Sequence, residues 1–192
     1  MLAVENRINS KDDLREWITY ERKKYRGGVL REIIPISEAD ILRKHQVILR
    51  KTEYYMNTGH KLMACIYKVR LNRIQNRYAL HIPTNTCGKG LKIMHVGPVL
   101  INGNATVGKD CVFHINTALV AGGTNDGVPY LEDGVIVGIG AVLMGNIQVR
   151  RNVAIGANAV VNKSVDEENI AVAGVPAKKV SNGGRLNWNK KK

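Results

Sequence analysis

The chain is short of aromatic and acidic residues. Among its 192 residues it has a single Phe, 5% aromatic residues in all, and 16 Asp and Glu against 29 Lys and Arg, so its formal net charge is +13. A surface of this sign attracts anions such as nucleic acid, anionic lipid or a phosphorylated cofactor. Basic and aromatic residues do not alternate, however, and no known RNA- or DNA-binding motif is present. We therefore expect no nucleic-acid partner.

Cysteines and long apolar runs are equally scarce. The three cysteines, Cys65, Cys87 and Cys111, have neither the spacing of metal ligands nor that of a disulfide framework. His, Asp, Glu and Cys form no clustered ligand set, so we expect no metal. No apolar run approaches the length of a membrane span, and the pattern of a secretory signal is missing. These absences predict a cytoplasmic protein without a membrane span.

A six-residue apolar repeat is the most informative feature that the sequence does contain. Bulky apolar residues recur at every sixth position at Ile101, Val107, Phe113, Leu119, Leu131, Val137, Leu143, Val149, Ile155 and Val161. One position of the series, Asn125, is polar and lies in the turn-rich stretch 125–129. Small or β-branched residues occupy the fifth place of the repeats, at Ala105, Cys111, Thr117, Val135, Ala141, Val153 and Ala159. Gly or Asn often follows the apolar residue.

A period of six matches neither an α-helix nor an isolated strand. It is typical of a hexapeptide parallel β-helix, in which each hexapeptide forms one side of a coil and its apolar residue stacks on the one a full coil away. Gly and Asn suit the corners because they adopt positive φ angles. Alternating strands of a sandwich also space apolar residues evenly, but the turn residues in register favour the coil. We therefore predict a mainly β protein with a left-handed parallel β-helix, an exception to the right-handed crossover rule.

The first 80 residues have a different pattern, that of a small α-helical region. We expect a short polar helix over 12–26, ended by Gly27 and Gly28. Ser37 and Asp40 have the spacing of a capping box, which predicts a second helix from there to about residue 56. A third helix over 60–76 would carry its apolar residues roughly along one face, at Leu62, Ile66, Val69 and Ile74.

The second and third predicted helices cannot bury their apolar faces alone. We expect them to pack on each other, on the first coil, or across a subunit interface. The chain is thus predicted to divide into a helical N-terminal region at 1–80, a β-helix domain at 81–180, and a basic C-terminal tail at 181–192.

Four segments stand out against the repeat. They are IMHVGPV at 93–99, GGT at 122–124, GIGAVLMGN at 138–146 and AGVPAK at 173–178. Together they resemble the hexapeptide-repeat, left-handed β-helix acyltransferases, and specifically the serine acetyltransferase-like branch. The resemblance covers about residues 82–180. It implies an acyltransferase that uses acetyl-CoA and works as a homotrimer, with active sites between the subunits.

His95 is the candidate catalytic residue. An alcohol is a weak nucleophile until its proton is being removed, and an imidazole suits that task near neutral pH. By resemblance, His95 projects into the groove between subunits, where the acceptor and the thioester meet. The alternative is that His95 caps a corner of the coil. His114, which follows an apolar position of the repeat, is a second candidate for the same groove.

The resemblance also places the co-substrate. Small residues would let the pantetheine arm of acetyl-CoA lie along the coil edge, and two lysines could meet its phosphates. The predicted contacts are Ile139, Gly140, Ala141, Ala157, Asn158, Lys163 and Lys178.

Departures from the serine enzymes bear on the acceptor. By resemblance, the carboxylate that orients the family's histidine is replaced by Leu80, and the acidic residue before that histidine is Met94. The family's Arg-His pair falls near 127–128, where neither residue occurs. We therefore expect a sugar or polysaccharide precursor as acceptor. The alternatives are serine, an amino sugar that takes an N-acyl group, and a non-catalytic trimeric β-helix binding protein.

Overall fold

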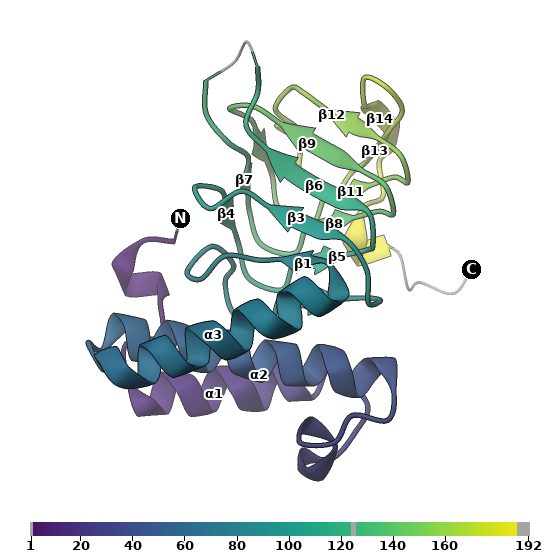
Figure 1. The fold of residues 1–192 in the computed structure, drawn as a ribbon. Coiled ribbons are helices and arrows are strands. Elements are labelled where there is room, and N and C mark those ends of the chain that lie inside the picture. Colours follow the sequence, from purple (N-terminus) through teal and green to yellow (C-terminus); the bar gives the residue numbers. More distant parts are fainter. Residues whose placement is uncertain (1, 124–125, 188–192) are drawn as a thin grey trace.

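Three helices lie together at one end of the molecule, next to the first strand of the β part (Figure 1). The structure is a computed structural model that describes residues 2–123 and 126–187. The helices are α1 (Lys11–Arg22), α2 (Glu38–Asn57) and α3 (Lys61–Tyr78), with short 3-10 helices η1 (Val4–Asn6), η2 (Val29–Glu32) and η3 (Arg185–Asn187). Within the described residues, none of these helices combines the length and the apolar character needed to cross a membrane.

Capping boxes start the first two helices. The Ser37 hydroxyl accepts the backbone N–H of Asp40 at 3.3 Å, and the Asp40 carboxylate accepts the backbone N–H of Ser37 at 3.0 Å. The helix start predicted at Ser37 is therefore confirmed. Ser10 and Asp13, which have the same spacing in the sequence, form an equivalent box at the start of α1. Each box satisfies N–H groups that have no partner inside the helix.

The first helix ends at Arg22, before the predicted end near residue 26. Tyr25 turns inward instead and is 8% exposed. Its hydroxyl accepts the backbone N–H of Ile93 at 2.8 Å. Contact with the first coil thus overrides the local helical pattern.

The face predicted for α3 is mostly exposed in the single chain. Three of its four residues are 74%, 43% and 44% exposed, in the order Leu62, Ile66 and Val69. The helix instead buries Leu71 and Gln75. The side-chain N–H of Gln75 donates to the carbonyl of Ile82 at 2.8 Å, which makes burial of this amide tolerable. Apolar periodicity did not identify the face that is buried within the chain, because one of the residues that define that face is polar.

Fourteen short strands form the β part of the described chain. They are β1 (Leu80–His81), β2 (Lys92–Ile93), β3 (Val99–Ile101), β4 (Thr106–Val107), β5 (Val112–Phe113), β6 (Thr117–Val120), β7 (Tyr130–Leu131), β8 (Ile136–Val137), β9 (Val142–Met144), β10 (Gln148–Val149), β11 (Ala154–Ile155), β12 (Val160–Val161), β13 (Ala171–Ala173) and β14 (Lys178–Ser181).

These strands belong to three sheets that the chain visits in turn. The sheet orders are β1-β3-β6-β9-β12, β10-β7-β4 and β14-β13-β11-β8-β5-β2. The named strands of these sheets pair in parallel, apart from the antiparallel pair β13–β14. From β1 to β13, successive strands lie in different sheets, and each pairs with the strand one coil away. This is the arrangement of a three-sided parallel β-helix. Figure 1 shows the coils stacked above the helices.

The six-residue repeat fills the interior of the coils, as predicted. All ten of its apolar residues are at most 2% exposed, and so are the seven residues in the fifth place. Ile101 pairs with Leu119, 18 residues later, and Leu143 pairs with Val161 at the same spacing. Leu119 and Leu143 pair across 24 residues because this coil includes the longer segment 121–129. The polar position Asn125 lies outside the described residues, as does Thr124.

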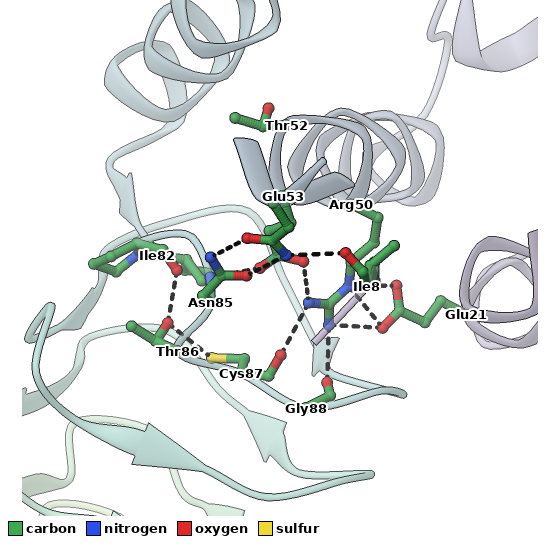
Figure 2. A network of polar contacts seen from close by, with 12 residues as sticks. Ile8, Glu21, Arg50, Thr52, Glu53, Ile82, Asn85, Thr86, Cys87 and Gly88 are labelled. Carbon is green, nitrogen blue, oxygen red and sulfur yellow. Dashed lines mark hydrogen bonds and ion pairs between the residues drawn. The ribbon is translucent and has the colours of Figure 1, made fainter. Parts of the chain in front are cut away.

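A buried ionic network joins the helices to the first coil (Figure 2). Arg50 of α2 is fully buried and contacts Glu21 of α1 and Glu53 of α2, each at 2.8 Å. The same guanidinium donates to the backbone carbonyls of Cys87 at 2.9 Å and Gly88 at 2.8 Å. One side chain therefore links two helices and the coil.

The chain after β14 returns to a corner of the coil. The backbone N–H of Gly184 donates to the Asn169 carbonyl at 2.7 Å, and that of Arg185 donates to the Asn152 carbonyl at 2.9 Å. This part of the predicted basic tail packs on the β-helix up to η3. Residues 188–192 lie outside the described part of the chain.

Candidate active site

His95 lies at the corner of the first coil, between β2 and β3. The backbone N–H of Met94 donates to the Phe113 carbonyl at 2.9 Å, and the N–H of Asn116 donates to the Pro98 carbonyl at 2.6 Å. The backbone on both sides of His95 is thus held by the next coil. The His95 side chain itself is 57% exposed. A rigid corner presents an accessible imidazole.

A carboxylate from the helical region meets this imidazole. Glu38 is the first residue of α2, directly after the N-cap Ser37. One of its oxygens, Oε1, accepts the backbone N–H of Val96 at 2.5 Å, and the other, Oε2, lies 3.3 Å from Nδ1 of His95. Sequence reasoning missed this contact. The capping box signalled where α2 begins, but no local signal relates that position to His95, 57 residues later.

His114 lies beside the same corner, on the next coil. The pairing of Lys92 with Val112 aligns β2 with β5, so that Met94 and His114 follow the two strands in parallel. Partial burial, together with the neighbouring His95 and Lys92, lowers the pKa of His114 below the usual histidine value. His114 therefore stays neutral to lower pH than an unperturbed histidine.

The co-substrate contacts predicted at the coil corners follow β8 and β11, at Ile139, Gly140, Ala141, Ala157 and Asn158. The backbone N–H of Gly140 donates to the Ile115 carbonyl at 3.1 Å, and that of Asn158 donates to the Ile139 carbonyl at 2.8 Å. These corners stack along one edge of the prism, and the corner of His95 belongs to the same edge. The structure thus brings them to the edge of His95, but onto later coils.

Gly140 occupies a position on this edge that only glycine fits. Its φ is +72°, in the left-handed region, and a Cβ there would lie 2.1 Å from the side-chain oxygen of Asn158. Ile139 is 43% exposed, and Ala157 and Asn158 are exposed as well. Ala141 is fully buried, so a ligand could reach its backbone but not its methyl group. Apart from Ile139, these corners therefore present backbone and small or polar side chains.

The two predicted phosphate contacts, Lys163 and Lys178, are both exposed. Lys163 follows β12, and Lys178 opens β14 opposite Ala173. Within the described ranges neither lysine forms an ion pair. Their ammonium groups are therefore available to an anion.

The cysteines contribute no nucleophile to this edge. Cys87 and Cys111 are buried in the core, and burial raises the pKa of each thiol to about 12. A thiol of such high pKa carries little of the reactive thiolate at neutral pH. Cys65 is exposed on α3, in the helical region.

A pocket of about 670 Å³ lies elsewhere, between the N-terminal segment with α1 and the coil face near Tyr130. It is lined by both acidic and basic side chains, such as Glu16, Asp133 and Lys109. None of the predicted site residues lines it.

Comparison with known proteins identifies relatives of the chain. No family model matches. The serine acetyltransferase of Buchnera aphidicola subsp. Acyrthosiphon pisum is 32% identical over 139 residues, which cover 69% of this chain and 48% of that protein. The serine acetyltransferase of Synechococcus elongatus is 34% identical over 116 residues, which cover 59% of this chain and 47% of that protein. The chain thus spans about half the length of these relatives.

A solved structure gives the same result for the fold. The serine acetyltransferase of Brucella abortus strain S19, in complex with coenzyme A, superposes with a TM-score of 0.59 at 26% identity. The match covers 90% of this chain and 68% of that one. The resemblance to the serine acetyltransferases indicated by the motifs is thereby confirmed, and the chain is a relative of these proteins.

Proposed function

We propose that the chain is an acetyl-CoA-dependent O-acetyltransferase in which His95 is the general base. The observation that carries the proposal is the position of His95, an exposed imidazole on a rigid corner of the coil. It lies on the edge that also contains the small-residue corners at Gly140 and Asn158. The relatives reported above are acetyltransferases, and they support the same chemistry.

The chemistry requires one proton acceptor. Nε2 of His95 takes the proton of the acceptor hydroxyl while its oxygen attacks the thioester carbonyl carbon. The carbon–sulfur bond then breaks, and the imidazolium returns the proton to the departing thiolate. The acetyl group moves directly to the acceptor, so no residue of the chain is acylated. A backbone N–H of an adjacent coil would stabilise the developing oxyanion.

The coil edge would hold the co-substrate. The Brucella abortus relative was solved in complex with coenzyme A, which favours the same ligand here. The corners at Ile139, Gly140, Ala141, Ala157 and Asn158 would line the pantetheine arm, and Lys163 and Lys178 would meet the phosphates.

The proposal includes the assembly of the chain. We infer a homotrimer with the edge of His95 facing a neighbouring subunit, a left-handed winding of the coil, and a domain boundary near residue 80. Mass measurement in solution by light scattering tests the assembly, and a monomer would contradict it.

Serine is the acceptor that the comparisons favour. The sequence departures at Leu80 and Met94 predicted a sugar, but the relatives reported above are serine acetyltransferases. Leu80 is a core residue that is 2% exposed, so core packing explains why it is apolar, and its identity gives little information about the acceptor. We therefore replace the predicted sugar with serine as the leading candidate.

An assay of thiol release from acetyl-CoA tests the proposal, with serine, hexoses and amino sugars offered in parallel. His95→Ala should lower turnover by about 10²- to 10⁴-fold, the usual contribution of a general base. His81→Ala is the matched control, since His81 is an exposed histidine in β1 and lies outside the proposed site. Equal activity of His95→Ala and His81→Ala would remove His95 from its role. Thiol release with a hexose but not with serine would restore the sugar as acceptor.

A further inference from the structure

We propose that Glu38 is a positioning residue for His95. In this arrangement the carboxylate accepts the Nδ1–H of the imidazole and thereby leaves Nε2 unprotonated, free to accept a proton. The catalytic meaning of the pairing rests on the proposed function, whereas the pairing itself rests on the contacts of Glu38. These contacts connect the start of α2 to the corner of the first coil.

Two points hold the carboxylate in place. Oε1 accepts the backbone N–H of Val96, the residue after His95, at 2.5 Å. Oε2 lies 3.3 Å from Nδ1 of His95. Because one oxygen is bound to the same turn that carries the histidine, the other has a defined position relative to the ring. A carboxylate tied only to its own helix would not have this precision.

The backbone of Glu38 is equally well held. The reciprocal hydrogen bonds of Ser37 and Asp40 define the first turn of α2, in which Glu38 lies. The N-terminus of a helix carries partial positive charge, which attracts a carboxylate at this position. A negative Glu38 is the state that pairs with an imidazole N–H or with an imidazolium.

Glu38 is the negative group beside His95 that can offset the positive charge around it. Lys92 on β2 lies on the same side of the coil, and its positive charge opposes an imidazolium, whereas the lowered pKa of His114 keeps that side chain neutral to lower pH. Among the described residues, Glu38 is the carboxylate within ion-pair distance of His95. It therefore offsets the charge of Lys92 when His95 takes a proton.

Glu38 also provides a carboxylate beside His95, where the sequence lacks the carboxylates that the resemblance implies. The positions at which the resemblance implies carboxylates carry Leu80 and Met94, and Leu80 is buried in the core. The orienting group here comes from another element, 57 residues before the histidine in the chain. The helical region thus supplies part of the site on the β-helix.

Glu38→Gln is the informative substitution. Its amide oxygen can still accept the N–H of Val96, whereas the negative charge facing His95 is lost. The matched control is Glu16→Gln, because Glu16 is also an exposed carboxylate of a helix and also contacts the coil, through Lys89 at 2.5 Å. Thermal unfolding of both variants checks that each is folded.

The first measurement does not need activity. Nitrogen NMR of the labelled protein reports which ring nitrogen of His95 carries the proton at a pH where the ring is neutral. We expect the Nδ1–H form in the wild type and in Glu16→Gln, and a shift towards the Nε2–H form in Glu38→Gln. An Nε2–H form of His95 in the wild type would overturn the proposal, whatever the activity of the enzyme.

The second measurement is the steady-state kinetics of acetyl transfer, which gives kcat and KM separately. Glu38→Gln should lower kcat by roughly tenfold to a hundredfold, the range seen when the partner that orients a metal-ligating histidine is lost, with the KM for acetyl-CoA changed less than twofold. A kcat equal to that of Glu16→Gln would refute the positioning role.

The two proposals fail in different ways. A wild-type protein that transfers no acetyl group to any acceptor, yet shows the expected change of tautomer in Glu38→Gln, contradicts the proposed function and upholds the pairing. An active wild type whose Glu38→Gln variant changes neither the tautomer nor kcat contradicts the pairing and leaves the proposed function intact.

Discussion

Arg50→Met is the substitution from which we expect the largest loss of stability. The guanidinium of Arg50 is fully buried, and so are its partners Glu21 and Glu53, at 1% and 2% exposure. Removing one partner of a buried ion pair costs about 3–5 kcal/mol, because the remaining charge stays buried without compensation. Two carboxylates lose their partner here, although each keeps one backbone N–H, from Gly90 and Asn85. We therefore expect a loss near the upper end, about 5 kcal/mol.

For a chain of this length each kcal/mol shifts the melting temperature by roughly 2–4 °C, so the expected drop is roughly 10–20 °C. The loss should also depend on pH. Burial already raises the pKa of Glu53, against the opposing pull of Arg50, and without Arg50 that pKa rises further. A carboxyl group with a raised pKa binds its proton more readily in the folded state, so stability is regained as the pH falls. Arg50→Met should therefore lose less stability at pH 5 than at pH 7.

Thermal and urea unfolding, followed by circular dichroism, measure both effects. Lys51→Met is the matched control, because Lys51 is the next residue of α2 and its ammonium contacts the ring of Tyr67 at 5.6 Å rather than a carboxylate. We expect the control to lose less than about 1 kcal/mol. The additional changes Glu21→Gln and Glu53→Gln should recover part of the loss. Similar melting temperatures for Arg50→Met and Lys51→Met would refute the reasoning.

Three further predictions concern the interior of the protein. Burial, with a smaller effect of Arg50, lowers the pKa of His45 from 6.5 to about 4. The unfolded chain therefore takes up the proton first, and about 3 kcal/mol of stability should be lost as the pH falls from 6.5 to 4. His45→Gln should reduce this dependence of stability on pH in urea titrations, and an unchanged dependence would assign it to other groups. Gln46 is 3% exposed, and its amide has no hydrogen-bond partner among the described residues, so Gln46→Leu should raise the urea midpoint by the equivalent of about 1 kcal/mol; a lower midpoint would show that the amide is satisfied. Phe113 is fully buried in the coil, so Phe113→Ala should cost about 3–5 kcal/mol in the same assay, and a loss below 1 kcal/mol would mean that the coil closes around the cavity.

The β-helix was predictable from the sequence because its signal is local and repeated. Each coil uses the same six-residue pattern, so spacing alone identifies the interior positions from Ile101 to Val161. The start of α2 was predictable for a similar reason, since a capping box needs Ser37 and Asp40 to be three residues apart. His95 was proposed as the catalytic residue from a motif that lies in one stretch of the chain.

Contacts between distant segments were decided by the tertiary structure. The buried face of α3 includes Gln75, which is tolerated there because the carbonyl of Ile82 accepts its hydrogen bond. Arg50 can be buried because two carboxylates and two coil carbonyls surround it. Glu38 reaches His95 because the helices pack at the first coil. No regular spacing in the sequence identifies such pairs. Packing removes their polar groups from water, and each group then needs a hydrogen-bond or ionic partner, which can come from a distant part of the chain.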